Sequence, residues 1–375
     1  MSSKEKIQEL LTLADIKING SRPWDIQVHN EKLYDRVLAQ GSLGLGESYM
    51  DGWWDVKALD QFFTKLLSAQ LDRKVRPIML VGTALKAALL NLQTKSRSKK
   101  VAQEHYDLGN EFYENMLDPE YMQYTCAYWN TPRGRAKNLS EAQKNKLDLI
   151  CRKLKLKKGE TVLELGGGWG GFAYYAAKHY GVKVTSYNIS KEQVAYAKKK
   201  CKGLPVTFKL DDYRNATGTF DKVVSIGMME HVGYKNYEKF FALIRERLKD
   251  GGLALVHTIG GLRSVTHTDP WIEKYIFPNS MLPSMAQITK ALEKTRFVLE
   301  DYHNIGADYD PTLMAWYKNY KKNWKKFEKD YGERFARMWD YYLLACAGSF
   351  RCRRNQLFQI VLSKEGVPGG YMPER

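Results

Sequence analysis

No apolar run in the 375-residue sequence approaches the ~18 residues that a membrane-spanning helix requires. The best candidate, residues 77–92, is short and is interrupted by Lys86. The first residues, Met1-Ser-Ser-Lys-Glu-Lys, contain no apolar signal core and resemble the start of an amphipathic helix. We therefore expect a soluble, intracellular protein.

Cysteine is scarce, and its spacing matches no common metal or redox motif. The five cysteines are Cys126, Cys151, Cys201, Cys346 and Cys352. They form no C-x-x-C pair and have no neighbouring histidine at zinc spacing. This pattern predicts free thiols in a reducing compartment and no structural metal. Internal repeats and low-complexity tracts are also absent. The length exceeds one average domain and the apolar content of 44% suffices for a packed core, so we expect two domains.

Acidic residues are in deficit, with 42 Asp and Glu against 59 Lys and Arg. Such a surplus of positive charge indicates a polyanionic partner, either nucleic acid or anionic lipid headgroups. No acid occurs from Arg73 to Gln103, where basic residues flank the apolar stretch 78–92. The pattern is typical of an interfacial element that docks on a membrane. The alternative is a basic linker that packs within the protein.

A second basic and aromatic run, residues 316–327, would suit phosphates or stacked bases. Its helical spacing favours instead one apolar face and a solvated lysine face. Near the N-terminus we expect an amphipathic helix at 4–13, a turn at 20–23 and a loop at 41–54, in which Gly41, Gly44 and Gly46 form turns. We predict a small helical domain at 1–70, a basic linker at 71–100 and a catalytic domain at 101–375.

The most informative motif is Thr-Val-Leu-Glu-Leu-Gly-Gly-Gly-Trp-Gly-Gly at 161–171, a strand that runs into a glycine cluster and a helix. Gly166, Gly168 and Gly171 satisfy G-x-G-x-x-G, which fits a nicotinamide dinucleotide as well as S-adenosylmethionine. A dinucleotide usually needs an acid at the end of the second strand, but that strand, 182–187, ends in Asn188. Glu164 lies inside the first strand, where its carboxylate could face the ammonium of a methionine moiety. These flanks favour S-adenosylmethionine, and a glycine turn that only packs helix against strand is the alternative.

Strands and helices alternate after this motif. Strands are expected at 206–210, 220–226 and 253–257, and helices at 190–201 and 236–248. Alternation predicts right-handed crossovers, a parallel sheet and a ligand at the carboxyl ends of the strands. The fold class is therefore α/β, with a Rossmann-like sheet of the class I S-adenosylmethionine-dependent methyltransferase type.

Polar groups follow two of these strands. Glu230 and His231 come after the fourth strand, and His257 closes the fifth. A carboxylate and imidazoles near a sulfonium could orient a substrate, move a proton or hold an anion. Cys126 could be a nucleophile, but its aromatic flanks favour a buried thiol. Tyr309 could offer a phenol, and an aromatic insertion at about 260–350 is the expected wall for an apolar substrate.

At this point the sequence resembles the cyclopropane-fatty-acyl-phospholipid synthases and, more distantly, the mycolic acid cyclopropane synthases. The resemblance runs from the N-terminal region to Arg354 and is carried by residues 41–54, His105-Tyr-Asp-Leu-Gly-Asn110, Gln123-Tyr-Thr-Cys-Ala-Tyr-Trp129, Glu230-His-Val-Gly233, His257-Thr-Ile-Gly260, Asp269-Pro-Trp-Ile272, Tyr275-Ile-Phe-Pro-Asn279 and 306–317. One departure is Gly167, where many members have cysteine or threonine.

The resemblance implies methylene transfer from S-adenosylmethionine to the cis double bond of an unsaturated acyl chain in a phospholipid. It implies a carbocation whose methyl proton is taken by bound bicarbonate, held by Cys126 (mainly through its backbone), Glu230, His257, Ile259 and Tyr309. The expected cofactor residues are Tyr124, Thr125, Glu164, Gly166, Gly168, Asn188, Ile189, Gln193, Asp212, Tyr213 and His231.

The expected partners are an anionic phospholipid surface and an unsaturated phospholipid substrate, and we expect a homodimer associated peripherally with the inner face of the membrane. A nucleic-acid methyltransferase is the second hypothesis, which the charge permits. Met228-Met-Glu-His stands after the fourth strand, however, where such an enzyme would carry Asn-Pro-Pro-Tyr or Pro-Cys. A lipid-surface binding protein without catalysis is a third hypothesis, which the intact glycine loop disfavours.

Overall fold

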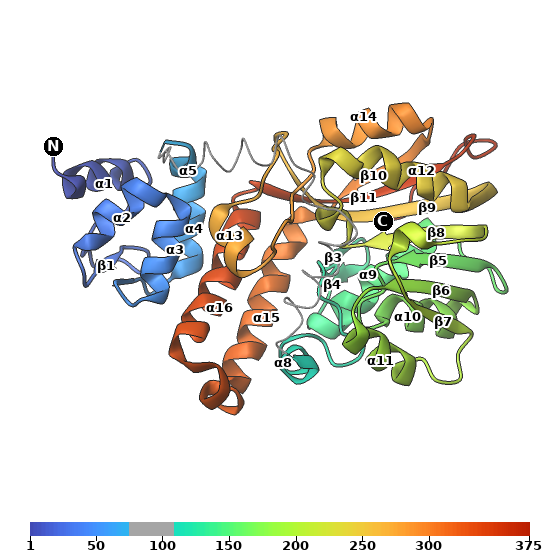
Figure 1. Ribbon diagram of the computed structural model, residues 1–375, viewed down its shortest axis with the longest axis horizontal. Coiled ribbons are helices and arrows are strands. Elements are labelled where there is room, and N and C mark those ends of the chain that lie inside the picture. Colours follow the sequence, from blue (N-terminus) through green and yellow to red (C-terminus); the bar gives the residue numbers. More distant parts are fainter. Residues whose placement is uncertain (75–108) are drawn as a thin grey trace. The chain divides into compact units, whose positions relative to one another are not determined.

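The computed structural model describes residues 1–74 and 109–375 (Figure 1). These residues form two compact units. Unit 1 comprises 1–74, 266–280 and 309–355, and unit 2 comprises 109–265, 281–308 and 356–375. Two parts of the expected aromatic insertion, 266–280 and 309–355, belong to the unit that contains the N-terminal helices, so neither unit is continuous in the sequence. The apolar core of the expected basic linker lies outside the described residues.

Unit 2 is built on a seven-stranded sheet in the order β10-β11-β9-β8-β5-β6-β7. The pairs β5–β6, β5–β8, β6–β7 and β8–β9 are parallel, whereas β10 and β11 are antiparallel to each other. The strands are β5 (Thr161–Leu165), β6 (Lys183–Asn188), β7 (Val206–Leu210), β8 (Phe220–Ile226), β9 (Leu248–Gly261), β10 (Val298–Asn304) and β11 (Asn355–Ser363). A separate two-stranded ribbon pairs β3 (Asn130–Thr131) with β4 (Gly134–Arg135).

Helices cover both faces of this sheet (Figure 1). Alternate strand residues enter different cores: Val162 packs with residues of α9, α10 and α11, and Leu163 packs with residues of α12 and α14. The α/β class is therefore confirmed. The helices are α8 (Gly109–Met116), α9 (Leu139–Lys153), α10 (Gly171–Tyr180), α11 (Lys191–Lys200), α12 (Tyr237–Arg247) and α14 (Met285–Thr295).

Two strands, β10 and β11, were not expected. β10 reads Val-Leu-Glu-Asp-Tyr-His-Asn and lies within the segment 260–350 that was expected to be an insertion. Part of that segment, including α14, thus completes the sheet unit rather than extending from it. β10 is rich in polar residues. Two of them, the adjacent Glu300 and Asp301, form specific polar contacts instead of packing in an apolar core.

Unit 1 is helical, apart from the two-stranded ribbon of β1 (Gln27–Val28) and β2 (Trp54–Asp55). The long helix α16 contacts α3, α4 and α15. At Gly348 of α16, a Cβ would come within 2.8 Å of Asp60 O, so glycine allows α16 and α4 to approach closely. The helices are α1 (Ser3–Thr12), α2 (Lys32–Gln40), α3 (Ser42–Met50), α4 (Leu59–Ser68), α5 (Leu71–Lys74), α13 (Pro270–Tyr275), α15 (Tyr309–Asn323) and α16 (Glu328–Arg351).

The expected loop at 41–54 is largely helix α3, so that prediction was wrong. Gly41 does turn the chain, with φ of 59°. Gly44 and Gly46 lie inside the helix and serve close packing: a Cβ at Gly44 would lie 2.4 Å from Arg36 O, and one at Gly46 would lie 2.3 Å from the Trp271 ring. The glycines mark contacts between elements rather than turns.

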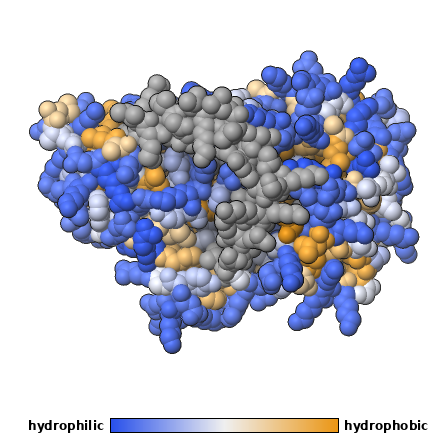
Figure 2. All heavy atoms as spheres, viewed as in Figure 1, coloured by the Kyte–Doolittle hydropathy of each residue, from blue (hydrophilic) through white to orange (hydrophobic). Residues whose placement is uncertain are grey.

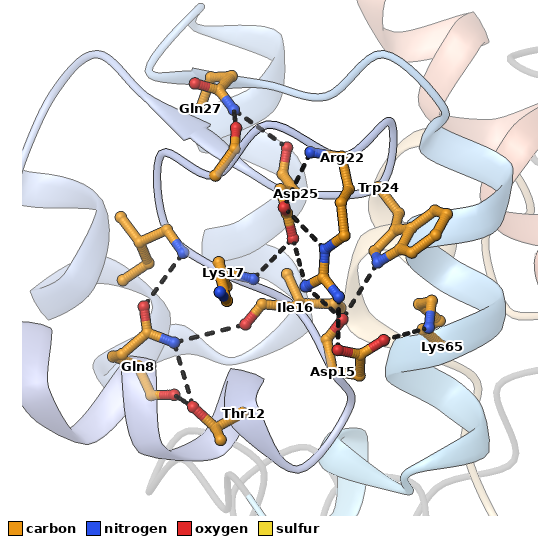
Figure 3. Close-up of polar contacts among 12 residues, drawn as sticks. Gln8, Thr12, Asp15, Ile16, Lys17, Arg22, Trp24, Asp25, Gln27 and Lys65 are labelled. Atoms are coloured by element: carbon orange, nitrogen blue, oxygen red, sulfur yellow. Dashed lines mark hydrogen bonds and ion pairs between the residues drawn. The ribbon is translucent and has the colours of Figure 1, made fainter.

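The expected turn at 20–23 is organised by the buried carboxylate of Asp25 (Figure 3). Asp25 accepts hydrogen bonds from the backbone N–H groups of Lys17 at 2.8 Å and Arg22 at 3.0 Å, and from the Arg22 side chain at 2.9 Å. These donors lower the pKa of Asp25 to about 2. Asp15 links the same arginine to Lys65 of α4, which ties the turn to the helices.

The surface is mainly hydrophilic in the view of Figure 2, with hydrophobic residues in small groups. The run 316–327 follows the favoured interpretation, because Trp316, Tyr320 and Phe327 are buried and the five lysines of the run are exposed. All five cysteines are free. Within 1–74 and 109–375, the helices are all too short or too polar to cross a membrane.

Candidate active site

The glycine cluster joins β5 to α10 in unit 2. Gly166 and Gly168 have positive φ angles of 86° and 50°, which favour glycine. The N–H of Gly166 donates to Tyr187 O at 2.9 Å, so the loop is fixed to the end of β6. The third glycine of the motif, Gly171, has a packing role, since a Cβ there would lie 2.0 Å from Tyr121 O. Residues 121–123 can therefore lie directly against the start of α10.

Glu164 is buried in β5, two residues before the loop. Burial raises the pKa of its carboxyl to about 7. Its Oε2 has no hydrogen-bond partner among the described residues, although it is out of reach of water. A buried acceptor of this kind needs a donor to offset its desolvation, and a ligand ammonium is one.

Asn188 and Gln193 form a small network at the end of β6. The amide nitrogen of Asn188 donates to Gly168 O and to Gln193 Oε1, both at 3.0 Å. Asn188 Oδ1 accepts from the N–H of Ser190, whose hydroxyl caps α11. The partly buried Ile189 lies between them. The network joins the glycine loop to the second helix of the sheet unit.

Asp212 follows β7 and is almost fully buried. Its carboxylate accepts from the backbone N–H of Arg214 at 2.9 Å and from the guanidinium of Arg214 at 2.7 and 2.6 Å. The neighbouring ring of Tyr213 packs 5.9 Å from Phe240. Asp212 thus has a clear structural partner in addition to any contact with a ligand.

Glu230 and His257 come from neighbouring parallel strand ends. Glu230 lies in the short 3-10 helix η2 (Met229–His231) after β8, and its Oε1 accepts from the N–H of Ile259 in β9 at 2.6 Å. Two residues earlier in β9, the carbonyl of His257 accepts from the N–H of Gly227 at 2.8 Å. Two backbone-anchored contacts therefore fix the two strand ends relative to each other.

The protonation of this pair follows from its burial. Burial raises the pKa of Glu230 to about 7 and lowers the pKa of His257 well below its usual value, so the imidazole is neutral. The amide nitrogen of Gln359 lies 3.3 Å from His257 Nδ1. An amide nitrogen only donates, so with the Gln359 amide in this orientation the ring proton is assigned to Nε2. Glu230 Oε2 and His257 Nε2 are both buried without a hydrogen-bond partner in the described part of the chain. One is an acceptor and the other a donor, a pair that suits a small anion bearing a hydroxyl.

The segment from Tyr124 to Cys126 approaches the same strand ends. A Cβ at Gly227 would lie 2.5 Å from the methyl group of Thr125, so Thr125 packs against the end of β8. Cys126 is fully buried, and its thiol lies 3.9 Å from Ile305 O. The Tyr124 ring is 5.3 Å from that of Tyr113 in α8. The favoured interpretation of Cys126 as a buried thiol agrees with this environment.

The two remaining expected site residues are His231 and Tyr309. His231 follows Glu230 in η2, and burial lowers its pKa to about 4, so it is neutral as well. Tyr309 begins α15 of unit 1, where its ring packs against those of Trp316 and Phe350.

Two buried polar residues of α9 were not anticipated from the sequence. Gln143 donates to Thr125 O at 2.9 Å, and Lys146 Nζ donates to Thr125 Oγ1 at 2.9 Å and to Gln123 Oε1. Both side chains are 0% exposed. The available signal was their position, because both fall on the stripe of α9 that also carries Leu139, Ala142 and Leu147 into the core.

A cavity of about 560 Å³ lies beyond the end of β9. Residues from the expected substrate wall contribute much of its lining, together with β11: Gly261, Leu262, Arg263, Ser264, Ser284, Met285, Ala286, Tyr302, Asn304, Gln356 and Phe358. The strand that carries His257 and Ile259 therefore leads directly to an open space in unit 2.

The geometry agrees with comparisons to known proteins. Residues 93–360 match the family described as mycolic acid cyclopropane synthetase. The cyclopropane-fatty-acyl-phospholipid synthase of Escherichia coli (strain K12) is 51% identical over 367 residues, covering 96% of this chain and 93% of that protein. The cyclopropane synthase MmaA2 from Mycobacterium tuberculosis has a TM-score of 0.66 at 29% identity, covering 71% of this chain and 98% of that one.

A further solved structure is the mycolic acid cyclopropane synthase CmaA1 complexed with SAH and CTAB, with a TM-score of 0.65 and 29% identity, covering 71% of this chain and 98% of that one. These matches confirm the resemblance found in the sequence and the class I fold of unit 2. The chain therefore belongs to the mycolic acid cyclopropane synthetase family of S-adenosylmethionine-dependent methyltransferases.

Proposed function

We propose that the chain transfers a methylene group from S-adenosylmethionine to the cis double bond of unsaturated acyl chains in membrane phospholipids, which forms cyclopropane fatty acyl phospholipids. The observation that carries the proposal is the pair of unsatisfied buried atoms, Glu230 Oε2 and His257 Nε2, at adjacent strand ends beside a glycine loop. The name of the Escherichia coli relative supplies the substrate class.

The cofactor site is proposed to use the residues around the glycine loop. Glu164 would face the ammonium of the methionine moiety through its unsatisfied Oε2. The other proposed contacts are Tyr124, Thr125, Gly166, Gly168, Asn188, Ile189, Gln193, Asp212, Tyr213 and His231. S-adenosylmethionine carries its methyl group on a sulfonium. The sulfur leaves as a neutral thioether, so even a weak alkene nucleophile can displace it from the methyl carbon.

The proposed reaction transfers one methylene group to the acyl chain in two steps. The alkene π electrons form a bond to the methyl carbon as the carbon–sulfur bond breaks, which leaves a carbocation on the acyl chain. Loss of one proton from the new methyl group supplies the electron pair that closes the ring. The cation must be shielded from water and from basic side chains. Burial of Glu230 and His257 excludes water, and the contact from the Gln359 amide occupies Nδ1, the basic nitrogen of the neutral imidazole.

We further propose that bicarbonate takes this proton. The neutral His257 would donate from Nε2 to an oxygen of the anion, and Glu230 Oε2 would accept from its hydroxyl group. The backbone of Cys126, Ile259 and the phenol of Tyr309 would complete the holders. Because the N–H of Ile259 already donates to Glu230, the first effect of Ile259 is to orient that carboxylate.

The enzyme is also proposed to act as a homodimer at the inner face of the membrane, where the surplus of basic residues favours an anionic phospholipid surface. The basic residues around the stretch 78–92 are the proposed docking element. They lie mostly outside the described residues, so this part of the proposal rests on sequence alone.

The proposed function is tested with vesicles of anionic, cis-unsaturated phospholipid and S-adenosylmethionine that is radiolabelled on the methyl group. Label in the lipid fraction that co-migrates with cyclopropane acyl esters would support the proposal. A parallel reaction with DNA and RNA tests the second hypothesis. Label in nucleic acid but none in lipid would overturn the proposed function.

A further inference from the structure

Gln359 is a buried primary amide in the middle of β11. Its side chain is 0% exposed, and the two nearest residues on the same face of the strand, Leu357 and Val361, are buried and apolar. Its amide oxygen is out of reach of water and has no hydrogen-bond partner among residues 1–74 and 109–375. Burying a polar group in this way is costly, so packing alone would favour an apolar side chain at this position.

The amide nitrogen of Gln359 lies 3.3 Å from His257 Nδ1. The two residues come from β11 and β9, which are neighbours in the sheet, and His257 is 1% exposed. In the part of the chain that the structure describes, no other hydrogen bond reaches the imidazole, because Nε2 has no partner there. The protonation of the ring therefore depends on Gln359.

The chemistry of this contact determines where the ring carries its proton. An amide nitrogen only donates, so in this orientation Nδ1 presents its lone pair to Gln359 and the single proton of neutral His257 lies on Nε2. A hydrogen bond to the lone pair stabilises the neutral ring and disfavours protonation at Nδ1. A carboxylate at the same place would do the opposite, because it would accept from Nδ1–H and stabilise the imidazolium.

The other titratable groups around His257 agree with a neutral ring. Burial lowers the pKa of His257 well below its usual value, and Lys146 and Lys153 of α9 act in the same direction. His303 lies opposite the glutamine in the β10–β11 register, and burial lowers its pKa to about 4, so it is neutral too. Glu230 of η2 is the acid of the proposed anion site, and burial raises its pKa to about 7. Only the glutamine supplies a donor to Nδ1 within the described residues.

A neutral donor suits an anion that has to act as a base. Bicarbonate is proposed to take a proton from the new methyl group while Glu230 Oε2 accepts from its hydroxyl. The second contact must then donate to the anion, and the Nε2–H group of His257 does so. An imidazolium would also donate, but its positive charge would stabilise the anion before proton transfer and so lower its basicity.

We propose that Gln359 is a positioning residue that holds His257 neutral with its proton on Nε2, so that bound bicarbonate is oriented and stays basic. This inference rests on the proposed function. Gln359 acts through His257, because its amide contacts Nδ1, the ring nitrogen that the anion does not use.

The direct test is ¹⁵N NMR of protein labelled at histidine. The chain has seven histidines, and the signals that disappear in His257→Gln assign the ring of interest. In the wild type we expect a protonated Nε2 and an unprotonated Nδ1 from pH 8 down to pH 5. A proton on Nδ1, in either a neutral or a charged ring, would overturn the inference, and this measurement needs no substitution of Gln359.

Gln359→Glu exchanges the donor for an acceptor with almost no change in shape. We expect its His257 ring to take up a second proton between pH 7 and pH 5, because an adjacent carboxylate favours the imidazolium. The ratio of turnover at pH 8 to turnover at pH 5 should then be about tenfold larger than in the wild type, the effect of one pKa unit on the basicity of the anion.

Gln356→Glu is the matched control. Gln356 is a buried glutamine of the same strand, and its amide oxygen accepts from Asn304 at 2.7 Å. The control also places a carboxylate in β11, but we expect its His257 spectrum and its ratio of turnovers to equal those of the wild type.

A merely structural role for Gln359 predicts a different pattern. Both glutamate variants would then lose thermal stability and turnover, while the His257 ring stayed neutral and the ratio of turnovers stayed that of the wild type; this result would overturn the inference. A wild type that shows no response to bicarbonate in buffers purged of carbon dioxide would instead refute the proposed bicarbonate step. The two failures are distinguishable, because the second appears in the unmodified enzyme whatever the histidine spectrum shows.

Discussion

Replacement of Glu230 by glutamine exchanges one carboxylate oxygen for an amide nitrogen. It therefore distinguishes an effect on catalysis from effects on cofactor binding and on stability. The amide oxygen of glutamine can still accept from the N–H of Ile259, a bond of 2.6 Å in the native protein. The amide nitrogen then occupies the place of Oε2, the unsatisfied acceptor proposed to receive the hydroxyl of bicarbonate. We expect turnover to fall by about 10² to 10⁴, the range for loss of a group that supports proton transfer.

The same substitution has a predictable effect on stability. The pKa of Glu230 is raised from 4.5 to about 7 by burial, so the folded state resists its ionisation. Its contribution to stability is fully present below pH 4.5 and is lost as pH rises through 7. The loss amounts to about 3 kcal/mol at pH 8. Glutamine does not ionise, so the variant should gain stability relative to the wild type as the pH is raised.

The assay combines three measurements on Glu230→Gln. Turnover is measured on unsaturated vesicles, S-adenosylmethionine affinity by calorimetry, and unfolding free energy by urea titration at pH 5 and pH 8. We expect near-complete loss of turnover, unchanged affinity, and a stability difference from wild type that shifts by about 2 to 3 kcal/mol between the two pH values. Turnover close to that of the wild type would remove Glu230 from the mechanism.

Two single substitutions and one charge-reversal variant test cofactor binding, loop packing and membrane docking. Glu164→Gln should weaken S-adenosylmethionine binding about tenfold at pH 8. The wild type should lose affinity below pH 7, where Glu164 takes up a proton, and the variant should not show this fall. Calorimetry that finds no pH dependence in the wild type would contradict this. Gly171→Ala should lower the melting temperature and weaken cofactor binding because its Cβ would meet Tyr121 O at 2.0 Å, whereas Gly203→Ala, with no atom within 4 Å, should cost only backbone strain. The charge-reversal variant replaces four basic residues with glutamate: Lys95, Arg97, Lys99 and Lys100. It should weaken vesicle sedimentation and activity at low salt but leave cofactor affinity unchanged. An equal loss on reversing the exposed Lys322 and Lys325 would assign docking elsewhere.

The sheet was predictable because its strands carry strong local signals. Each of β5 to β8 is a short apolar or alternating run bounded by polar turns, and the expected boundaries differ from the observed ones by one residue at most. The strand β10 was missed since Glu300 and Asp301 interrupt its apolar pattern, and their partners come from distant segments. Helix α3 was missed because Gly44 and Gly46 indicate turns locally, whereas they permit contacts with Arg36 and Trp271. Tertiary packing, which the local sequence does not contain, decided both cases.

The site was predictable to the extent that it lies at strand ends. Parallel topology alone brings Glu230 and His257 together, and the bond from Ile259 to Glu230 agrees with that expectation. Lys146 was not found, because a lysine within a helix normally lies on its solvated face. Only the three-dimensional structure reveals that its ammonium donates to two neutral oxygens and forms no direct ion pair among the described residues.

The central claim is the formation of a cyclopropane ring on a phospholipid acyl chain, and isotopic analysis of the product tests it most directly. The purified protein is incubated with cis-unsaturated phospholipid vesicles, bicarbonate and S-adenosylmethionine whose methyl group is fully deuterated, and the acyl chains are analysed by mass spectrometry and NMR. The account predicts a ring methylene that retains two of the deuterons, because one is lost when the ring closes. A methyl branch that retains all of them, or acyl chains without deuterium, would contradict it.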